Sequence, residues 1–163
     1  MATSITSANS SLVMTATSRG VATGLSSSSS ALSGLSGSLG VPIRLQGWAA
    51  DSAFSVDAQQ RAVVVQGVDG NVHFGWVPHL NNFNLSLMPD SDSQSYLENL
   101  MAAEDMLRET LLITAVLIVP SIGRKYALGN GAITNGTPVP AHGRVLAAQA
   151  TTITFATCKP AAY

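Results

Sequence analysis

Hydrophobic and polar positions alternate over short stretches from residue 41 onward, which is typical of β-strands with one buried face. The alternating stretches are Val41–Leu45, Phe54–Val56, Phe83–Leu87 and the closing segment Arg144–Thr157, which we interpret as a strand pair or one bent strand. Leu111–Val119 is apolar except for Thr114 and predicts a buried strand. These patterns predict a chain that is mainly β.

Two turn signals divide the strands. Asp69-Gly70-Asn71 separates the apolar runs Ala62–Val68 and Val72–Trp76, and it predicts a β-hairpin because Asp and Gly both tolerate positive φ. Gly129-Asn130-Gly131 predicts a second turn, and the proline-containing segment Thr134–Gly143 predicts a loop.

A single helix is predicted over about residues 92–110. Apolar side chains recur there at helical spacing, and Ser91 with Gln94 is typical of a capping box. Strands followed by one helix and then by more strands favour a β-sandwich or barrel with one packed α-helix.

Residues 1–40 differ from the rest, since they are mostly Ser, Gly, Thr and Ala with Arg19 as their one charged residue. We therefore divide the chain into an N-terminal arm, 1–40, and a β domain, 41–163. Ordering such a segment costs about 1–2 kcal/mol per residue. We expect neighbouring subunits to order the arm, and its deletion to leave a folded core. Leu12, Met14 and Ala16 alternate and predict a strand that is added to a sheet edge, so Leu12 and Met14 are candidate inter-subunit contacts.

Charge is scarce throughout the chain. Asp, Glu, Lys and Arg make up 10% of the residues, against about 25% in an ordinary soluble domain. The net charge is -1 and the mean hydropathy is +0.28. A surface with so little charge favours association, so we interpret the chain as one subunit of an assembly. We expect neither a secretory signal nor a membrane span, and an intracellular place of synthesis.

No catalytic, cofactor or metal site is predicted, and we expect the protein not to be an enzyme. His73, His79 and His142 lack the spacing of metal ligands, and no nucleophile elbow is present. Core or interface packing is favoured over a sugar platform for the aromatic side chains Trp48, Phe74, Trp76 and Tyr96. The adjacent bases Arg124 and Lys125 are candidate inter-subunit contacts.

Residues from about Val41 to Phe155 resemble the tail tube proteins of contractile-tailed bacteriophages. The resemblance lies in the hairpin turn at Val68–Val72, the strand Phe83–Leu87 and the single helix with Tyr96–Leu100. It is most specific in the strings Tyr126-Ala127-Leu128-Gly129-Asn130-Gly131 and Thr152-Ile153-Thr154-Phe155. The Ser-rich residues 1–40 depart from the compact start of that family.

This resemblance implies a β-sandwich or barrel subunit that forms stacked hexameric rings. The rings would build a hollow tube inside a contractile sheath and conduct DNA, and the inner tube of type VI secretion systems shares the fold. The implied partners are other copies of the chain, the sheath, baseplate and tail-terminator proteins, and the tape measure protein and DNA in the lumen. The implied location is the virion tail, assembled in the cytoplasm of the host bacterium.

A conduit for DNA should not bind phosphate, so its lumen should be neutral or acidic. Asp51 and Asp57 are candidate lumen-facing residues on this ground, and ordinary turn aspartates are the alternative. Two other functions stay open from the sequence. One is a surface carbohydrate-binding or adhesin-type β module, and the other is a subunit of a secretion-system tube.

Overall fold

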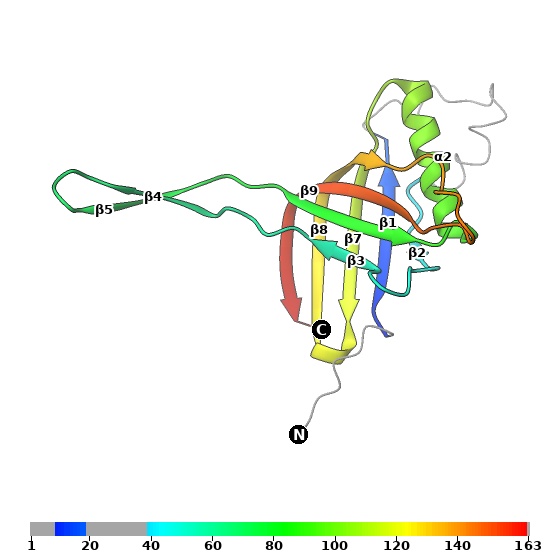
Figure 1. Cartoon of the computed structure of the whole chain (residues 1–163), viewed down its shortest axis with the longest axis horizontal. Helices are drawn as coiled ribbons and strands as arrows, with labels where there is room; N and C mark the ends of the chain where they lie inside the picture. The colour runs from blue at the N-terminus through cyan, green and yellow to red at the C-terminus, as the bar shows by residue number, and fades with distance from the viewer. Residues whose placement is uncertain (1–8, 19–38, 163) are drawn as a thin grey trace.

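A computed structural model describes residues 9–18 and 39–162 of the chain (Figure 1). The described elements, in chain order, are β1 Ser11–Thr17, β2 Ile43–Leu45, β3 Phe54–Val56, β4 Ala62–Gln66, β5 Val72–Trp76, β6 Asn81–Leu87, α2 Asp92–Leu107, β7 Leu112–Val119, the 3-10 turn η1 Pro120–Ile122, β8 Arg124–Gly136 and β9 Gln149–Ala162. The fold is mainly β with one packed helix among the described residues, as the sequence predicts.

Seven strands form one curled antiparallel sheet in the order β2-β1-β7-β8-β9-β6-β3. Strands β4 and β5 pair only with each other and form the hairpin that Asp69-Gly70-Asn71 predicts. The sheet curls in the manner of a half-barrel and presents one face to the helix α2 (Figure 1).

The core lies between the helix and the concave face of the sheet. Phe83, Leu85 and Leu87 alternate with exposed or half-buried polar residues along β6 and are at most 1% exposed. Helix α2 contributes Leu97 and Leu100 to the same cluster. The alternating pattern of β6 and the helical spacing of leucines are therefore confirmed as the two sides of one core.

The helix begins as the sequence predicts and ends earlier. The Ser91 hydroxyl accepts a hydrogen bond from the Gln94 backbone N–H at 3.1 Å and caps the first turn. The Gln94 side chain donates to Glu98 instead of closing a capping box. The last helical residue is Leu107, because Arg108 adopts the left-handed conformation with φ of 53°.

The sequence prediction of a turn at Gly129-Asn130-Gly131 is wrong. These residues lie inside β8, where the pairing with β7 shifts register between Ile113 and Ala115. Asn130 has a φ of 53°, and the extra residue makes a β-bulge. A bulge and a turn both need the left-handed conformation, so the local sequence signal is the same for both.

Strand β1 changes the division of the chain at residue 40. It lies between β2 and β7, and its pairing with β7 runs from Ser11↔Ile118 to Thr17↔Leu112. Residues 11–17 are therefore part of the main sheet of the β domain. The rest of the predicted arm, apart from residues 9–10, 18 and 39–40, lies outside the described residues.

Strand β7 is buried on one face only, contrary to the buried strand that the apolar run Leu111–Val119 predicts. Ile113 and Ala115 are buried, whereas Thr114 is exposed and Val116 half-buried on the opposite face. Within the described residues, no helix is long and apolar enough to cross a membrane.

Candidate functional site: the projecting hairpin and the outer faces of the sheet

The hairpin β4–β5 has two distinct faces. Residues directly opposite each other in an antiparallel pair point to the same side. One face carries the pairs Ala62↔Trp76, Val64↔Phe74 and Gln66↔Val72, and the other carries Val63↔Gly75 and Val65↔His73. The first face is therefore a broad apolar surface with two aromatic rings, and the second is narrower.

The hairpin projects away from the curled sheet (Figure 1), and all ten of its strand residues are exposed. Trp76 is 74% exposed, Phe74 76% and Val64 59%. Burying a Val or Phe side chain stabilises a protein by about 1.5–3 kcal/mol. These exposed side chains do not contribute that free energy while they face water. An isolated two-stranded hairpin is at best marginally stable in water. The hairpin therefore fits a surface that another protein chain covers.

The turn of the hairpin is held by its own polar residues. Gly70 has a φ of +81°, and Asp69 accepts hydrogen bonds from the backbone and side-chain amides of Asn71. The bond from the Asn71 side chain, with that from its backbone, holds the pKa of the Asp69 carboxyl below its usual range. Asp69 thus has a structural role in the turn.

The base of the hairpin is anchored to the end of the sheet. Asn81 is 5% exposed, donates through Nδ2 to the Phe155 carbonyl at 3.2 Å, and accepts a hydrogen bond from Gln59. The Val77 backbone N–H donates to the Arg61 carbonyl at 3.2 Å across the two strands. These bonds fix the direction in which the hairpin leaves the sheet.

The convex face of β6, β8 and β9 carries a ladder of uncharged polar side chains. Thr152 donates to Asn84 Oδ1 at 2.8 Å, and Thr154 donates to Asn82 Oδ1 at 3.0 Å. The hydroxyls of Thr134 and Thr154 lie 3.0 Å apart and extend the ladder to β8. We call these five residues the Asn/Thr ladder. Their hydroxyl and amide groups form hydrogen bonds with one another, so this face presents fixed dipoles and little charge.

Asp57, a candidate lumen residue, lies at the edge of the Asn/Thr ladder. Its Oδ1 accepts a hydrogen bond from Asn84 Nδ2 at 2.9 Å, just after β3. Asp51 precedes β3 in an exposed loop, where it lines a pocket together with Trp48 and Phe54. The two carboxylates thus flank one edge strand, and only Asp57 is bonded to the ladder.

Leu12 and Met14, candidate inter-subunit contacts, are 2% and 0% exposed in the chain's own core. This expectation is corrected for both: their alternation in the sequence marks the inner face of β1, and the chain's own residues cover these side chains. Arg124 and Lys125 begin β8 directly after η1, with Arg124 exposed and Lys125 half-buried. Their position leaves them available to another chain.

The four candidate aromatic residues are not brought together. Trp48 and Tyr96 pack against the core, whereas Phe74 and Trp76 lie on the hairpin. The ring of Trp48 meets Phe54 edge-on at 5.8 Å, and Phe54 stacks on Phe83 at 5.7 Å. Trp48 therefore helps to hold the edge strand β3, and the four residues do not form one platform.

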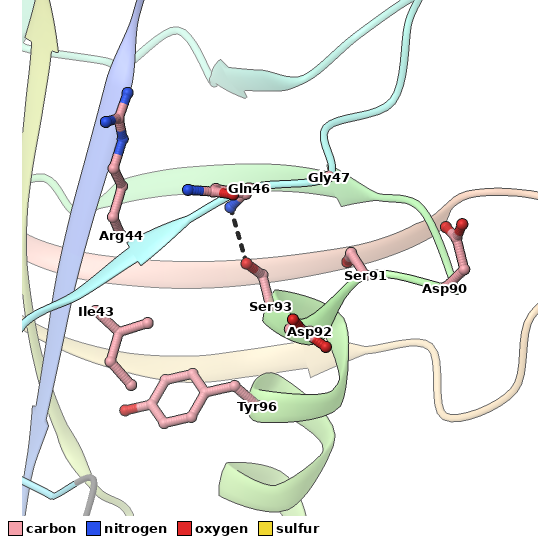
Figure 2. Close-up of a pocket in the computed structure, with 9 residues that line it drawn as sticks. All are labelled: Ile43, Arg44, Gln46, Gly47, Asp90, Ser91, Asp92, Ser93 and Tyr96. Atoms are coloured by element: carbon pink, nitrogen blue, oxygen red, sulfur yellow. Dashed lines mark hydrogen bonds between the residues drawn. The ribbon is translucent and has the colours of Figure 1, made fainter.

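A pocket of about 670 Å³ lies beside the N-terminus of α2, and Figure 2 shows residues that line it. Its hydroxyls serve the backbone: Ser93 Oγ accepts from the Gln46 N–H at 2.8 Å, and Ser91 caps the helix. Among the described residues the buried Tyr96 hydroxyl has no hydrogen-bond partner, and burial raises the pKa of Tyr96. These contacts fasten the loop that follows β2 to the helix.

The histidines are dispersed over the hairpin, its base and the loop before β9. His73 is on β5, and His79 packs edge-on to Trp76 with ring centres 6.4 Å apart. In the part of the chain that the structure describes, no three His, Cys, Asp or Glu side chains are grouped so that they could hold a metal ion.

The family described as tail fiber protein gp32 matches residues 3–159. The chain belongs to this family. It is therefore a phage-tail-type protein, as its resemblance to tail tube proteins indicates. No curated protein matches the chain.

Solved structures of contractile injection systems share the fold. A chain of the anti-feeding prophage baseplate has a TM-score of 0.53 at 9% identity, over 99% of this chain and 98% of that one. A chain of an extracellular contractile injection system, from the sheath/tube terminator of PVC in its extended state, has a TM-score of 0.53 at 9% identity over 93% of both chains. A chain of the cap that terminates the anti-feeding prophage tube has a TM-score of 0.50 at 13% identity, over 69% of this chain and 80% of that one.

Sequence reasoning noted Phe74 and Trp76 but missed the extent of the exposed surface around them. Both faces of β4 carry valines, and this pattern alone is typical of a strand buried within one chain. The available signal was the low overall charge, which indicates that apolar surface is covered between chains.

Proposed function

We propose that this protein is the structural subunit of a phage tail tube, which polymerises as stacked hexameric rings into a hollow conduit for DNA inside a contractile sheath. Its partners are other copies of itself, the sheath, baseplate and tail-terminator proteins, and the tape measure protein and DNA in the lumen. It has no enzymatic role, it assembles in the host bacterial cytoplasm, and it ends up in the virion tail.

The exposed hairpin is the observation that carries this proposal. Its apolar residues have no partner layer within the described chain, and identical neighbours supply one wherever copies are arranged in a ring. A ring of identical subunits uses one head-to-tail contact repeated until it closes. Each copy then both offers a hairpin and covers one.

The Asn/Thr ladder supports the assignment of a lumen. A surface over which DNA slides should offer few cations, because each Lys or Arg that pairs with a phosphate strengthens binding. The ladder has hydroxyls and amides bonded to one another, with the Asp57 carboxylate at its edge. We place Asp57 toward the lumen on this basis and leave Asp51 in the flanking loop.

Electron microscopy of the purified protein tests the proposal, with Phe74→Ser as the disruptive variant. We expect the wild type to form rings and hollow tubes as its concentration rises. The Phe74→Ser variant should need a concentration roughly ten- to a hundredfold higher, because it forgoes burial of an aromatic ring.

Val145→Ser is the matched control, since Val145 is 78% exposed in the loop before β9, away from the hairpin. It should assemble as the wild type does. Wild-type protein that stays monomeric at high concentration, or equal assembly of the wild type and Phe74→Ser, would contradict the proposal.

A terminal or baseplate ring is the second candidate, because the similar solved structures come from a baseplate, a cap and a sheath/tube terminator. The same micrographs separate the two functions. Rings that never stack favour a terminal or baseplate component, and tubes of increasing length favour the bulk tube.

A further inference from the structure

The two ends of strand β8 carry features that complement each other. At its start, η1 projects Ile122, which is 47% exposed, and the bases Arg124 and Lys125 follow directly. We call residues Pro120–Lys125 the knob. Gly123 adopts the left-handed conformation with φ of 62°, which makes the tight reversal at its tip.

At the far end of β8 the surface is hollowed. A depression of about 450 Å³ lies between α2 and the last residues of β8. We call it the hollow. Its apolar lining includes Met101, Ala102, Ile133 and Pro138. A methyl group added to Gly136 would lie 2.3 Å from the Met101 sulfur, so helix and strand are in close contact there.

Three carboxylates, Glu98, Glu104 and Asp105, surround this apolar lining. Glu98 and Glu104 are fixed in place: Glu98 accepts from Gln149 Nε2 at 3.2 Å, and Glu104 accepts from the Leu111 backbone N–H at 2.8 Å. Asp105 is exposed. The hollow thus combines an apolar lining with negative charge, and the knob combines an apolar tip with positive charge.

We propose that the knob of one copy inserts into the hollow of a second copy, and that this contact stacks one ring on the next. The inference rests on the proposed function. Knob and hollow lie at opposite ends of a 13-residue strand, at most about 40 Å apart, so both contacts can be made at once by one copy. A head-to-tail contact of this kind continues without closing.

The direction of the contact distinguishes it from the hairpin contact. In Figure 1 the hairpin extends across the direction of β7 and β8. The knob comes at the start of β8, and the last residues of β8 line the hollow, so knob and hollow lie at the two ends of that strand. The two contacts therefore extend the assembly in different directions. We assign the hairpin to neighbours within a ring and the knob to the neighbouring ring.

Two charge-reversal variants test the proposal, Arg124→Glu in the knob and Asp105→Arg in the hollow. Each places like charges together when copies of the same variant stack, so each alone should form rings and raise the concentration for tube growth at least about tenfold. Preformed rings of the two variants, mixed in equal amounts, should grow tubes. The glutamate introduced into one knob then faces the arginine introduced into the other variant's hollow. At the next ring contact, the unaltered Arg124 of one variant faces the unaltered Asp105 of the other.

Arg44→Glu is the control, since Arg44 is an exposed base on β2 outside both surfaces. It should form tubes as the wild type does. A second measurement is disulfide capture with Ile122→Cys and Ala102→Cys in a Cys158→Ser background. Oxidised tubes should then give a ladder of covalent multiples, and each single-cysteine protein should not.

If either charge variant grows tubes at the wild-type concentration, the stacking contact is wrong and the proposed function still stands. The same conclusion follows if the mixture of the two kinds of ring fails to grow tubes. Oxidised tubes without a covalent ladder overturn it as well. Wild-type protein that forms no rings or tubes overturns the proposed function and this contact together.

Discussion

Gly131 lies where the backbone of β8 passes over the core ring of Phe155. The two residues are paired across β8 and β9, and Phe155 is fully buried. A methyl group at position 131 would lie 2.4 Å from the ring, which is too close for any real contact. Glycine is therefore required here for space, while the neighbouring Asn130 supplies the left-handed conformation of the bulge.

We expect Gly131→Ala to lower the free energy of unfolding by about 1–3 kcal/mol, because the Phe155 ring must shift within a packed core. Urea denaturation of the purified variant measures this. Gly143→Ala is the control, since its added methyl group would approach only the Val145 carbonyl, at 3.6 Å. Equal stability of the two variants would show that the ring has room to move.

The ionisation of Glu104 bears on folding stability. Partial burial raises the pKa of its carboxyl, the hydrogen bond from Leu111 opposes this rise, and nearby Asp105 adds to it. The folded state therefore holds the proton more tightly than the unfolded state. Stability from this group is present at low pH and is lost as the pH rises through the raised pKa.

We expect Glu104→Gln to be more stable than the wild type at neutral pH, because the amide oxygen can still accept from Leu111 without a buried charge. Thermal denaturation across pH 4 to 8 measures the difference. It should shrink as the pH falls through the raised pKa of the carboxyl. A difference that stays constant with pH would mean that packing, and not ionisation, separates the two proteins.

At the scale of elements, β1 shows how composition can mislead. Its residues stand in a Ser-rich segment, yet the inner positions are apolar and complete the core between β2 and β7. Deleting residues 1–40 would remove this strand and expose that part of the core. The expectation that this deletion leaves a folded core is therefore corrected, since β1 is part of that core.

We expect Met14→Ala to destabilise the fold by about 2–5 kcal/mol, because Met14 is fully buried. Val13→Ala, on the half-buried outer face of the same strand, should cost far less. Chemical denaturation of both variants measures this contrast. Equal losses would contradict the expectation that burial of Met14 on the inner face contributes more than the outer face does.

The sequence predicted the elements whose local pattern has one physical meaning. Alternation predicted β6, and Asp-Gly between apolar runs predicted the hairpin. It could not separate a turn from a bulge at Gly129-Asn130-Gly131, since both use the same backbone conformation. The knob and hollow depend on the two ends of one long strand, and no short pattern predicts where such ends lie.

At the scale of the whole molecule, the scarcity of charge and the location of charge have different consequences. The hairpin exposes valines and aromatic rings, which favour burial between copies. Two bases, Arg124 and Lys125, follow η1, and three carboxylates, Glu98, Glu104 and Asp105, surround the hollow. The proposed assembly experiments test the two separately, since we expect a hairpin variant to weaken ring formation and a charge variant to weaken stacking.

The position of β1 also sets an order of events during synthesis. Its last residue, Thr17, bonds through its side chain to the Leu112 carbonyl, 95 residues later in the chain. At about 5–20 residues per second, a ribosome adds those 95 residues in roughly 5 to 20 s. Strand β1 thus gains its place in the sheet only when β7 leaves the ribosome, and until then the segment with Leu12 and Met14 lacks this neighbouring strand.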